Sequence, residues 1–124
     1  MFPRSAAAAA FAMPGGEGSS APRTRPVDLS HLARQTLGDR ALEQEVLQLF
    51  VHQALSMRDQ IADAATPERL RLCHTLKGSA RGIGAFAVAN CLAEIESRPD
   101  DKQLLKRLSS LIDEVRDFIA AISR

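Results

Sequence analysis

The chain has few of the residues that serve the commonest binding functions. It contains no tryptophan, no tyrosine and only 5 phenylalanines among 124 residues, so it lacks the aromatic platform on which single-stranded nucleic acids stack. Its 16 basic residues nearly balance 15 acidic ones, and a net charge of +1 creates no overall field toward nucleic acid or an anionic membrane. We therefore expect neither partner.

Long apolar runs and cysteines are also scarce. No stretch approaches the roughly 18 apolar residues of a membrane span, so we expect a cytoplasmic protein. The two cysteines, Cys73 and Cys91, each lie nine residues from Gly82, and if the chain reverses there they come to similar heights in the core. We expect reduced, buried thiols. A zinc site that adds His74 is disfavoured because adjacent helical residues point about 100° apart, so no metal site is predicted.

The composition divides the chain into a tail and one domain. Residues 1–26 are rich in Ala, Pro, Gly and Ser and cannot build a core, so we expect a disordered low-complexity tail. Its segment Ala6–Met13 is too weakly apolar to indicate a signal peptide. Residues 27–124 are enough for one compact domain.

Apolar residues at three- and four-residue steps predict helices through this domain. A short helix has Asp28 as its N-cap, and a longer one covers about 40–64 with Asp39 as its N-cap. The inner face of the short helix should carry Leu29, Leu32 and Leu37. The inner face of the longer one should carry Leu42, Val46, Leu49, Phe50, Ala54, Met57 and Ile61.

The rest of the domain predicts three more helices. Thr66 should cap the first of them, with Pro67 at its first position. Gly82 and Gly84 indicate a tight reversal, after which the helical pattern resumes over 85–96. The last helix has the most regular stripe: Leu104, Leu108, Leu111, Val115, Phe118 and Ile122. No alternating apolar run suggests a sheet. We predict an all-α fold, an antiparallel up-down-up-down four-helix bundle with a short N-terminal capping helix.

One histidine stands outside the apolar stripe of its helix. That stripe consists of Leu70, Cys73, Leu76, Ala80 and Ile83. His74 points elsewhere, and Lys77, Gly78 and Arg81 share its face because they follow it by three, four and seven positions. A glycine inside a helix costs roughly 0.5–1 kcal/mol relative to alanine, so Gly78 indicates that a partner surface approaches closely.

This group of residues suits phosphoryl chemistry. A neutral imidazole keeps a nucleophilic nitrogen near pH 7, and the cations of Lys77 and Arg81 can offset phosphoryl charge. We expect the side chain of Lys77 to be exposed. The reversal should bring Glu94 and Glu96 near His74, where either could accept a hydrogen bond from Nδ1–H and leave Nε2 free. No metal-binding carboxylates accompany the group, so a partner must supply that half of the site.

The chain contains His74-Thr75-Leu76-Lys77-Gly78-Ser79-Ala80, followed by Gly84-Ala85, and this run resembles the signature of histidine-containing phosphotransfer (HPt) domains of bacterial two-component phosphorelays. The resemblance implies that His74 is phosphorylated, that Lys77 is the motif lysine and that Gly78 gives access. It favours Glu96 over Glu94 as the residue that orients the ring. The family often has Asn or a similar residue where this chain has Gly82, so a polar contact is expected to be missing there.

The resemblance also implies a function. Such a domain carries phosphoryl groups between the aspartates of response-regulator receiver domains, which supply Mg²⁺, so this chain would need no cofactor of its own. A hybrid histidine kinase would stand upstream. Two alternatives remain: a histidine-kinase fragment, although no glycine-rich nucleotide loop is present, and a helical interaction module without phosphotransfer. We expect a monomer.

Overall fold

The structure is a computed structural model that describes residues 25–123. These residues form five helices and no strand, so the all-α prediction is confirmed for this part of the chain. The helices are α1 (Leu29–Gln35), α2 (Arg40–Asp63), α3 (Thr66–Ile83), α4 (Phe86–Ser97) and α5 (Lys102–Ile122). The predicted tail over residues 1–26 lies outside the described residues except for its last two.

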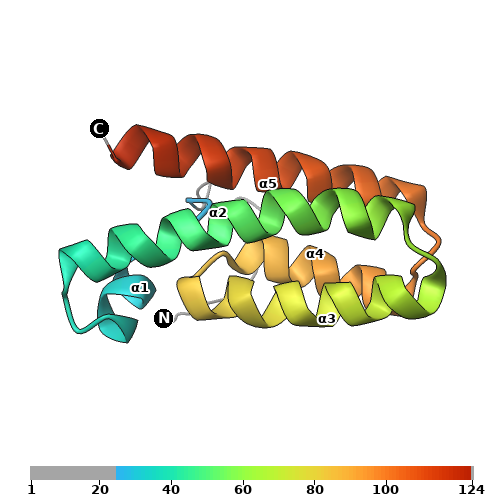
Figure 1. Ribbon diagram of the computed structural model, residues 1–124, viewed down its shortest axis with the longest axis horizontal. Coiled ribbons are helices and arrows are strands. Elements are labelled where there is room, and N and C mark those ends of the chain that lie inside the picture. The colour runs from blue at the N-terminus through green and yellow to red at the C-terminus, as the bar shows by residue number, and fades with distance from the viewer. Residues whose placement is uncertain (1–24, 124) are drawn as a thin grey trace, which may run out of the picture.

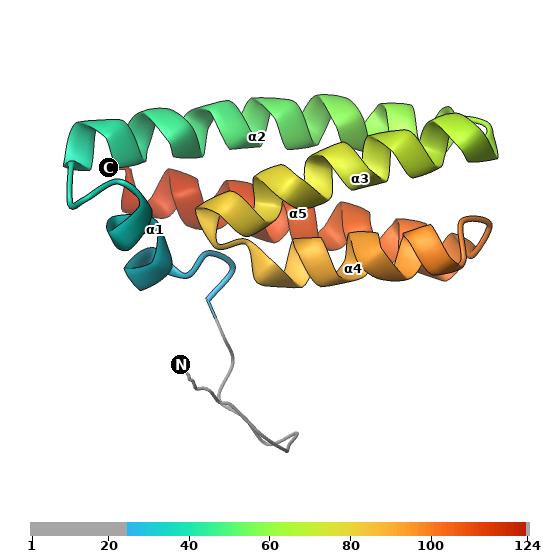
Figure 2. The ribbon, with the colours of Figure 1, turned by 90° about the horizontal axis from the view of Figure 1, so that it is seen from below.

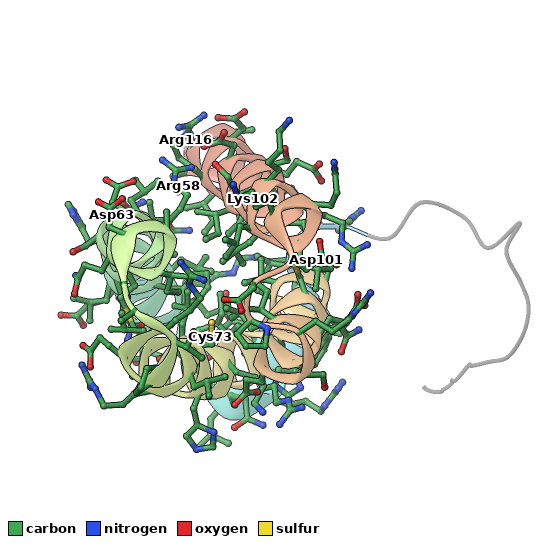
Figure 3. The ribbon with its side chains drawn as sticks, turned by 90° about the vertical axis from the view of Figure 1, so that its right-hand side faces the viewer. Arg58, Asp63, Cys73, Asp101, Lys102 and Arg116 are labelled. Carbon is green, nitrogen blue, oxygen red and sulfur yellow. The ribbon has the colours of Figure 1, made fainter. Side chains whose placement is uncertain are left out.

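The four longer helices lie alongside one another around a shared core (Figures 1 and 2). In Figure 2 the chain runs along α2 from left to right, returns along α3, and repeats this course with α4 and α5. Each helix from α2 to α5 packs against the next, α5 packs back against α2, and α1 contacts α3. The view along the bundle places Cys73 among the helices (Figure 3), where its side chain is fully buried.

The helix starts follow the predicted caps with one exception. The carboxylates of Asp28 and Asp39 accept hydrogen bonds from the backbone N–H of His31 and Leu42, both at 3.0 Å, as capping predicts. Thr66 is not a cap. Ala65 provides the first helical carbonyl, because the N–H of Arg69 donates to its oxygen at 2.8 Å, and Thr66 is therefore the first residue of α3.

The reversal between α3 and α4 needs only one of the two expected glycines. The helix continues through Gly82 to Ile83, and Gly84 leaves it with φ +89°. The N–H of Ala85 donates to Ala80 O at 2.8 Å, the bond that closes a Schellman turn. The N–H of Asp28 donates to Gly84 O at 2.9 Å, so the same turn also anchors the chain just before α1.

Several leucines expected inside lie outside. In α2, Leu42 and Leu49 are 40% and 64% exposed, whereas Leu47 is buried. The reason is that α2 carries two apolar stripes and buries the one with Leu47, Phe50, Ala54, Met57 and Ile61. Leu37 is 93% exposed because α1 ends at Gln35 and the turn that follows directs this side chain outward.

Arg69 holds the end of the bundle opposite α1. Its guanidinium donates to the carbonyl oxygens of Ile61 and Ala62 at the end of α2, and to that of Pro99 before α5, at 2.8, 3.1 and 2.7 Å. These acceptors are helix-end or loop carbonyls that would otherwise lack protein partners.

Among the described residues, no helix combines the length and the apolar character that crossing a membrane requires.

Candidate functional site

His74 lies on the solvent face of α3, midway along the bundle. Its side chain is 77% exposed, whereas Cys73 and Leu76 beside it are fully buried. The ring nitrogen Nδ1 lies 3.5 Å from Oε2 of Glu96 on α4, slightly beyond good hydrogen-bond length. The imidazole is thus accessible to a partner on one side and faces a carboxylate on the other.

The other carboxylate oxygen of Glu96 accepts a hydrogen bond from Nζ of Lys77. The side chains of Lys77 and Glu96 are only 16% and 24% exposed. The expectation that Lys77 is exposed is therefore wrong. Its flexible stem lies along the junction of α3 and α4, because the carboxylate offers its ammonium a nearby partner.

Glu94 does not join this group. It lies on another side of α4, where its carboxylate oxygen Oε1 is 2.7 Å from Nη2 of Arg107 on α5 and 3.6 Å from Nη2 of Arg98. Residues two positions apart on a helix point about 200° apart, so Glu94 and Glu96 cannot face the same neighbour. The structure brings Glu96 to His74 and directs Glu94 toward α5.

The helix surface beyond His74 is open. A side-chain carbon added at Gly78 or at Gly82 would meet no atom within 4 Å. Arg81 is exposed, and within residues 25–123 it makes no ion pair. Neither glycine is therefore required by packing inside the described part of the domain.

We did not predict from the sequence that α2 exposes apolar residues beside the solvent face of α3. Arg58 marks the α5 side of α2, because Nη1 of Arg58 binds Oδ1 of Asp113 at 2.7 Å. Leu49 lies nine residues earlier, about two and a half helical turns, so it points to the opposite flank, toward α3. Leu42 lies seven residues before Leu49 on the same flank. We call Leu42, Leu49, Gly78 and Gly82 the α2–α3 face. The signal in the sequence was the second apolar stripe of α2.

Cys73 and Cys91 are free and buried, as predicted. Burial, with the negative charge of Glu96 as the next cause, raises the pKa of the Cys73 thiol to about 11. Burial also raises the pKa of Cys91. Both therefore remain thiols near neutral pH. No three His, Cys, Asp or Glu residues of the described chain are arranged as a metal site.

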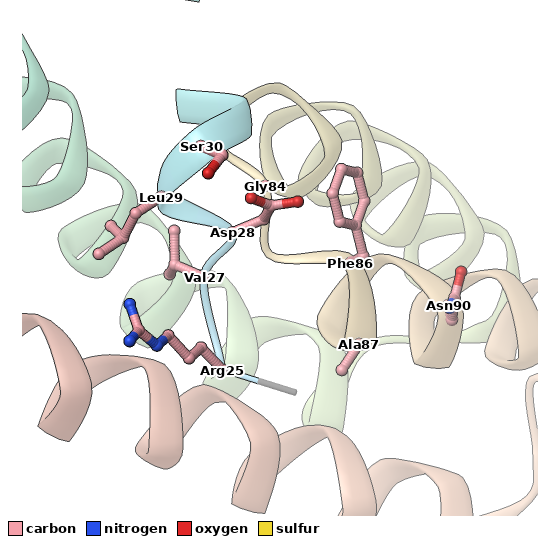
Figure 4. Close-up of a pocket in the computed structure, with 9 residues that line it drawn as sticks. All are labelled: Arg25, Val27, Asp28, Leu29, Ser30, Gly84, Phe86, Ala87 and Asn90. Carbon is pink, nitrogen blue, oxygen red and sulfur yellow. The ribbon is translucent and has the colours of Figure 1, made fainter. Parts of the chain in front are cut away.

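The site lies apart from the pocket that the described residues form beside α1. This pocket of about 500 Å³ lies where the chain enters α1 and α4 begins (Figure 4). Its lining includes Arg25, Asp28 and Phe86, and none of His74, Lys77, Gly78, Arg81 or Glu96. An exposed histidine on an open helix face suits a protein surface better than a small molecule, which binding sites usually enclose.

Comparison with known proteins gives one match. The model of the Hpt domain family matches residues 44–118, a segment that contains His74 and every other predicted site residue. No curated protein and no solved structure matches the chain.

Proposed function

The chain belongs to the Hpt domain family, whose members carry phosphoryl groups on a histidine in two-component phosphorelays, and from this premise we propose that it accepts a phosphoryl group from a receiver-domain aspartate and passes it to another receiver domain. The observation that carries the proposal is the geometry of His74, an exposed imidazole whose Nδ1 faces the Glu96 carboxylate. A hybrid histidine kinase would supply the first receiver domain with phosphate.

In the proposed transfer, Nε2 of His74 attacks the phosphorus of the receiver's aspartyl phosphate. The N–P bond forms as the O–P bond breaks, and the electron pair returns to the receiver's carboxylate. Nδ1 keeps its proton, so the ring gains positive charge on the side where Glu96 lies 3.5 Å away. The chain would need no cofactor or nucleotide site of its own, because the receiver domain brings the Mg²⁺ that offsets phosphoryl charge.

The receiver domain would dock over His74 and the α2–α3 face. Gly78 and Gly82 let another backbone come close, and the exposed Leu42 and Leu49 offer apolar area next to them. Arg81 follows Gly78 by about one turn of α3 and adds an exposed cation that suits an acidic partner surface. The short helix α1, which contacts α3, would border this docking area.

We propose that the fold is an antiparallel up-down-up-down four-helix bundle with α1 as its capping helix. The helix contacts and the hydrogen bond from Asp28 to Gly84 support it. We also propose that the protein is a monomer, since the principal apolar stripes of α2 to α5 meet in one core within a single chain. We propose a cytoplasmic location as well.

Transfer of label tests the function. The purified protein is incubated with a ³²P-phosphorylated receiver domain and Mg²⁺, and separately with ATP and Mg²⁺. We expect label from the receiver domain only, with the acid lability of phosphohistidine, and its passage to a second receiver domain. Label from ATP alone would support the kinase-fragment alternative. Absence of label with a panel of receiver domains would support an interaction module.

A bulky residue at Gly78 should weaken docking without harming the helix. Because the space around the position is open and glutamine has a higher helix propensity than glycine, Gly78→Gln should keep the helix content by circular dichroism. Its side chain would hold the receiver domain away from His74, and we expect the Kd to rise roughly tenfold or more. Ala120→Gln, at an exposed position on α5, is the matched control. An unchanged Kd for Gly78→Gln would remove the access role of this glycine.

A further inference from the structure

The four basic residues of α3 differ in what they contact. Arg69 donates to carbonyl oxygens, and Arg71 and Lys77 each bind a glutamate. Within residues 25–123, Arg81 has no acidic partner and its guanidinium makes no hydrogen bond. Arg81 is therefore the cation of this helix whose charge no described side chain balances.

Arg81 shares the face of His74 across an open stretch of helix. Seven helical residues advance about 10.5 Å and complete nearly two turns, so the two side chains leave α3 in almost the same direction. Helical side chains lean toward the N-terminus of their helix, which directs the long Arg81 side chain back over Gly78 and toward His74. At Gly78 an added Cβ would meet no atom within 4 Å, so the described chain leaves this space open.

Arg71 lies on the other side of His74, three residues before it, and differs in both respects. Its side chain leans away from the histidine. Its Nε and Nη2 donate to the carboxylate of Glu68 at 2.9 and 2.5 Å. Both Arg71 and Arg81 are exposed, so the chain offers a matched pair of cations that differ in direction and in pairing.

Phosphorylation would change the charge at this face. A phosphoryl group adds roughly 1.5 to 2 negative charges near neutral pH. On Nε2 of His74 it would add them close to the carboxylate of Glu96, which lies 3.5 Å from the other ring nitrogen. The ammonium of Lys77 binds that carboxylate and already offsets its charge. The guanidinium of Arg81 has a planar set of N–H donors that can bind two phosphoryl oxygens at once.

We propose that Arg81 holds the phosphoryl group after it has reached His74, and so sets the equilibrium of transfer toward the phosphorylated carrier. The inference rests on the proposed function and adds which protein keeps the phosphoryl group at equilibrium. Arg81 forms no covalent bond and gives up no proton, since only the N–P and O–P bonds change. The guanidinium attracts the charged phosphoryl group and not the neutral imidazole, so it stabilises only the phosphorylated state.

The equilibrium ratio of label on the two proteins tests this role. Carrier, receiver domain and Mg²⁺ are mixed with limiting ³²P-phosphorylated receiver domain, at concentrations below the Kd of docking. We expect Arg81→Gln to lower the ratio of labelled carrier to labelled receiver about tenfold, because a hydrogen-bonded charge pair is lost. Arg81→Lys should lower the ratio less, since it keeps the charge but not the planar donors. Arg71→Gln should leave it unchanged.

The ratio also separates this role from a contact with the receiver surface. A docking contact changes the forward and reverse rates by the same factor and cannot move the equilibrium between the free proteins. An unchanged ratio in Arg81→Gln would therefore overturn the inference. An equal fall in Arg71→Gln would overturn it as well, because it would show a general effect of positive charge on α3.

A second readout needs no receiver domain. Phosphoramidate can phosphorylate a histidine directly, as its P–N bond breaks and ammonia leaves. After loading, we expect the nitrogen-15 NMR signals of the Arg81 guanidinium to shift, those of Arg71 to stay, and neither to shift in His74→Gln. Unshifted Arg81 signals in the loaded protein would contradict the inference. If the loaded protein showed the shift but no receiver domain exchanged label with it, the proposed function would fail while the role of Arg81 would stand.

Discussion

Replacing His74 with glutamine should abolish the acid-labile label that the wild-type protein takes from a phosphorylated receiver domain. Glutamine keeps a polar side chain but has no nucleophilic ring nitrogen, so the N–P bond cannot form. We expect the label to fall to background, a loss of at least a hundredfold. Because the His74 side chain is 77% exposed, the stability of the variant should stay within about 0.5 kcal/mol of wild type.

The chain provides its own controls, since it contains two other histidines. His52 is exposed on α2, and His52→Gln should keep full labelling. In His31 the Nε2 atom is buried and the ring packs edge-on against Phe86 with centroids 5.1 Å apart, so Nε2 of His31 is not accessible to a receiver domain. Label that persisted in His74→Gln and mapped to His52 would refute the assignment of the phosphorylated residue.

Gly84→Ala should cause the largest loss of stability among the glycine substitutions. Gly84 has φ +89°, a backbone conformation that residues with a side chain rarely adopt. A Cβ there would lie 2.9 Å from the backbone oxygen of Asp28, closer than real contacts allow. Relief would move the turn and disturb the hydrogen bond from Asp28 N–H to Gly84 O. We expect the free energy of unfolding, measured by urea denaturation, to fall by about 2–4 kcal/mol.

Gly78→Ala and Gly82→Ala are the matched controls. Both positions lie inside α3, and an added Cβ would meet no atom within 4 Å. Alanine should therefore stabilise the helix by roughly 0.5–1 kcal/mol at each position. A Gly84→Ala variant as stable as these would show that the turn between α3 and α4 relaxes at little cost.

Gly78 and Gly84 belong to the same run of sequence, but we expect their substitutions to have different effects. Gly78 stands on an open surface and serves an approaching partner in our proposal, whereas Gly84 is buried against Asp28. We therefore expect substitutions at Gly78 to alter receiver affinity at constant stability. Substitutions at Gly84 should lower transfer only in proportion to the unfolded fraction.

Local sequence determined the helices and one face of the site. Spacing within a single helix placed His74, Gly78 and Arg81 on the solvent side of α3, and the structure shows all three exposed. The caps at Asp28 and Asp39 were likewise predictable. These features depend on residues less than two turns apart, whose relative directions follow from helix geometry alone.

Tertiary structure decided the remainder, since a helical pattern gives directions relative to its own axis and not which neighbour meets each side. Two stripes of α2 were apolar enough to form the core, and packing against α3 and α5 left Leu49 outside. The stem of Lys77 could extend into solvent or lie along its helix. The carboxylate of Glu96, 19 residues away on α4, turned it inward. A flexible lysine side chain turns toward a nearby carboxylate, and only the folded chain brings the carboxylate of Glu96 beside Lys77.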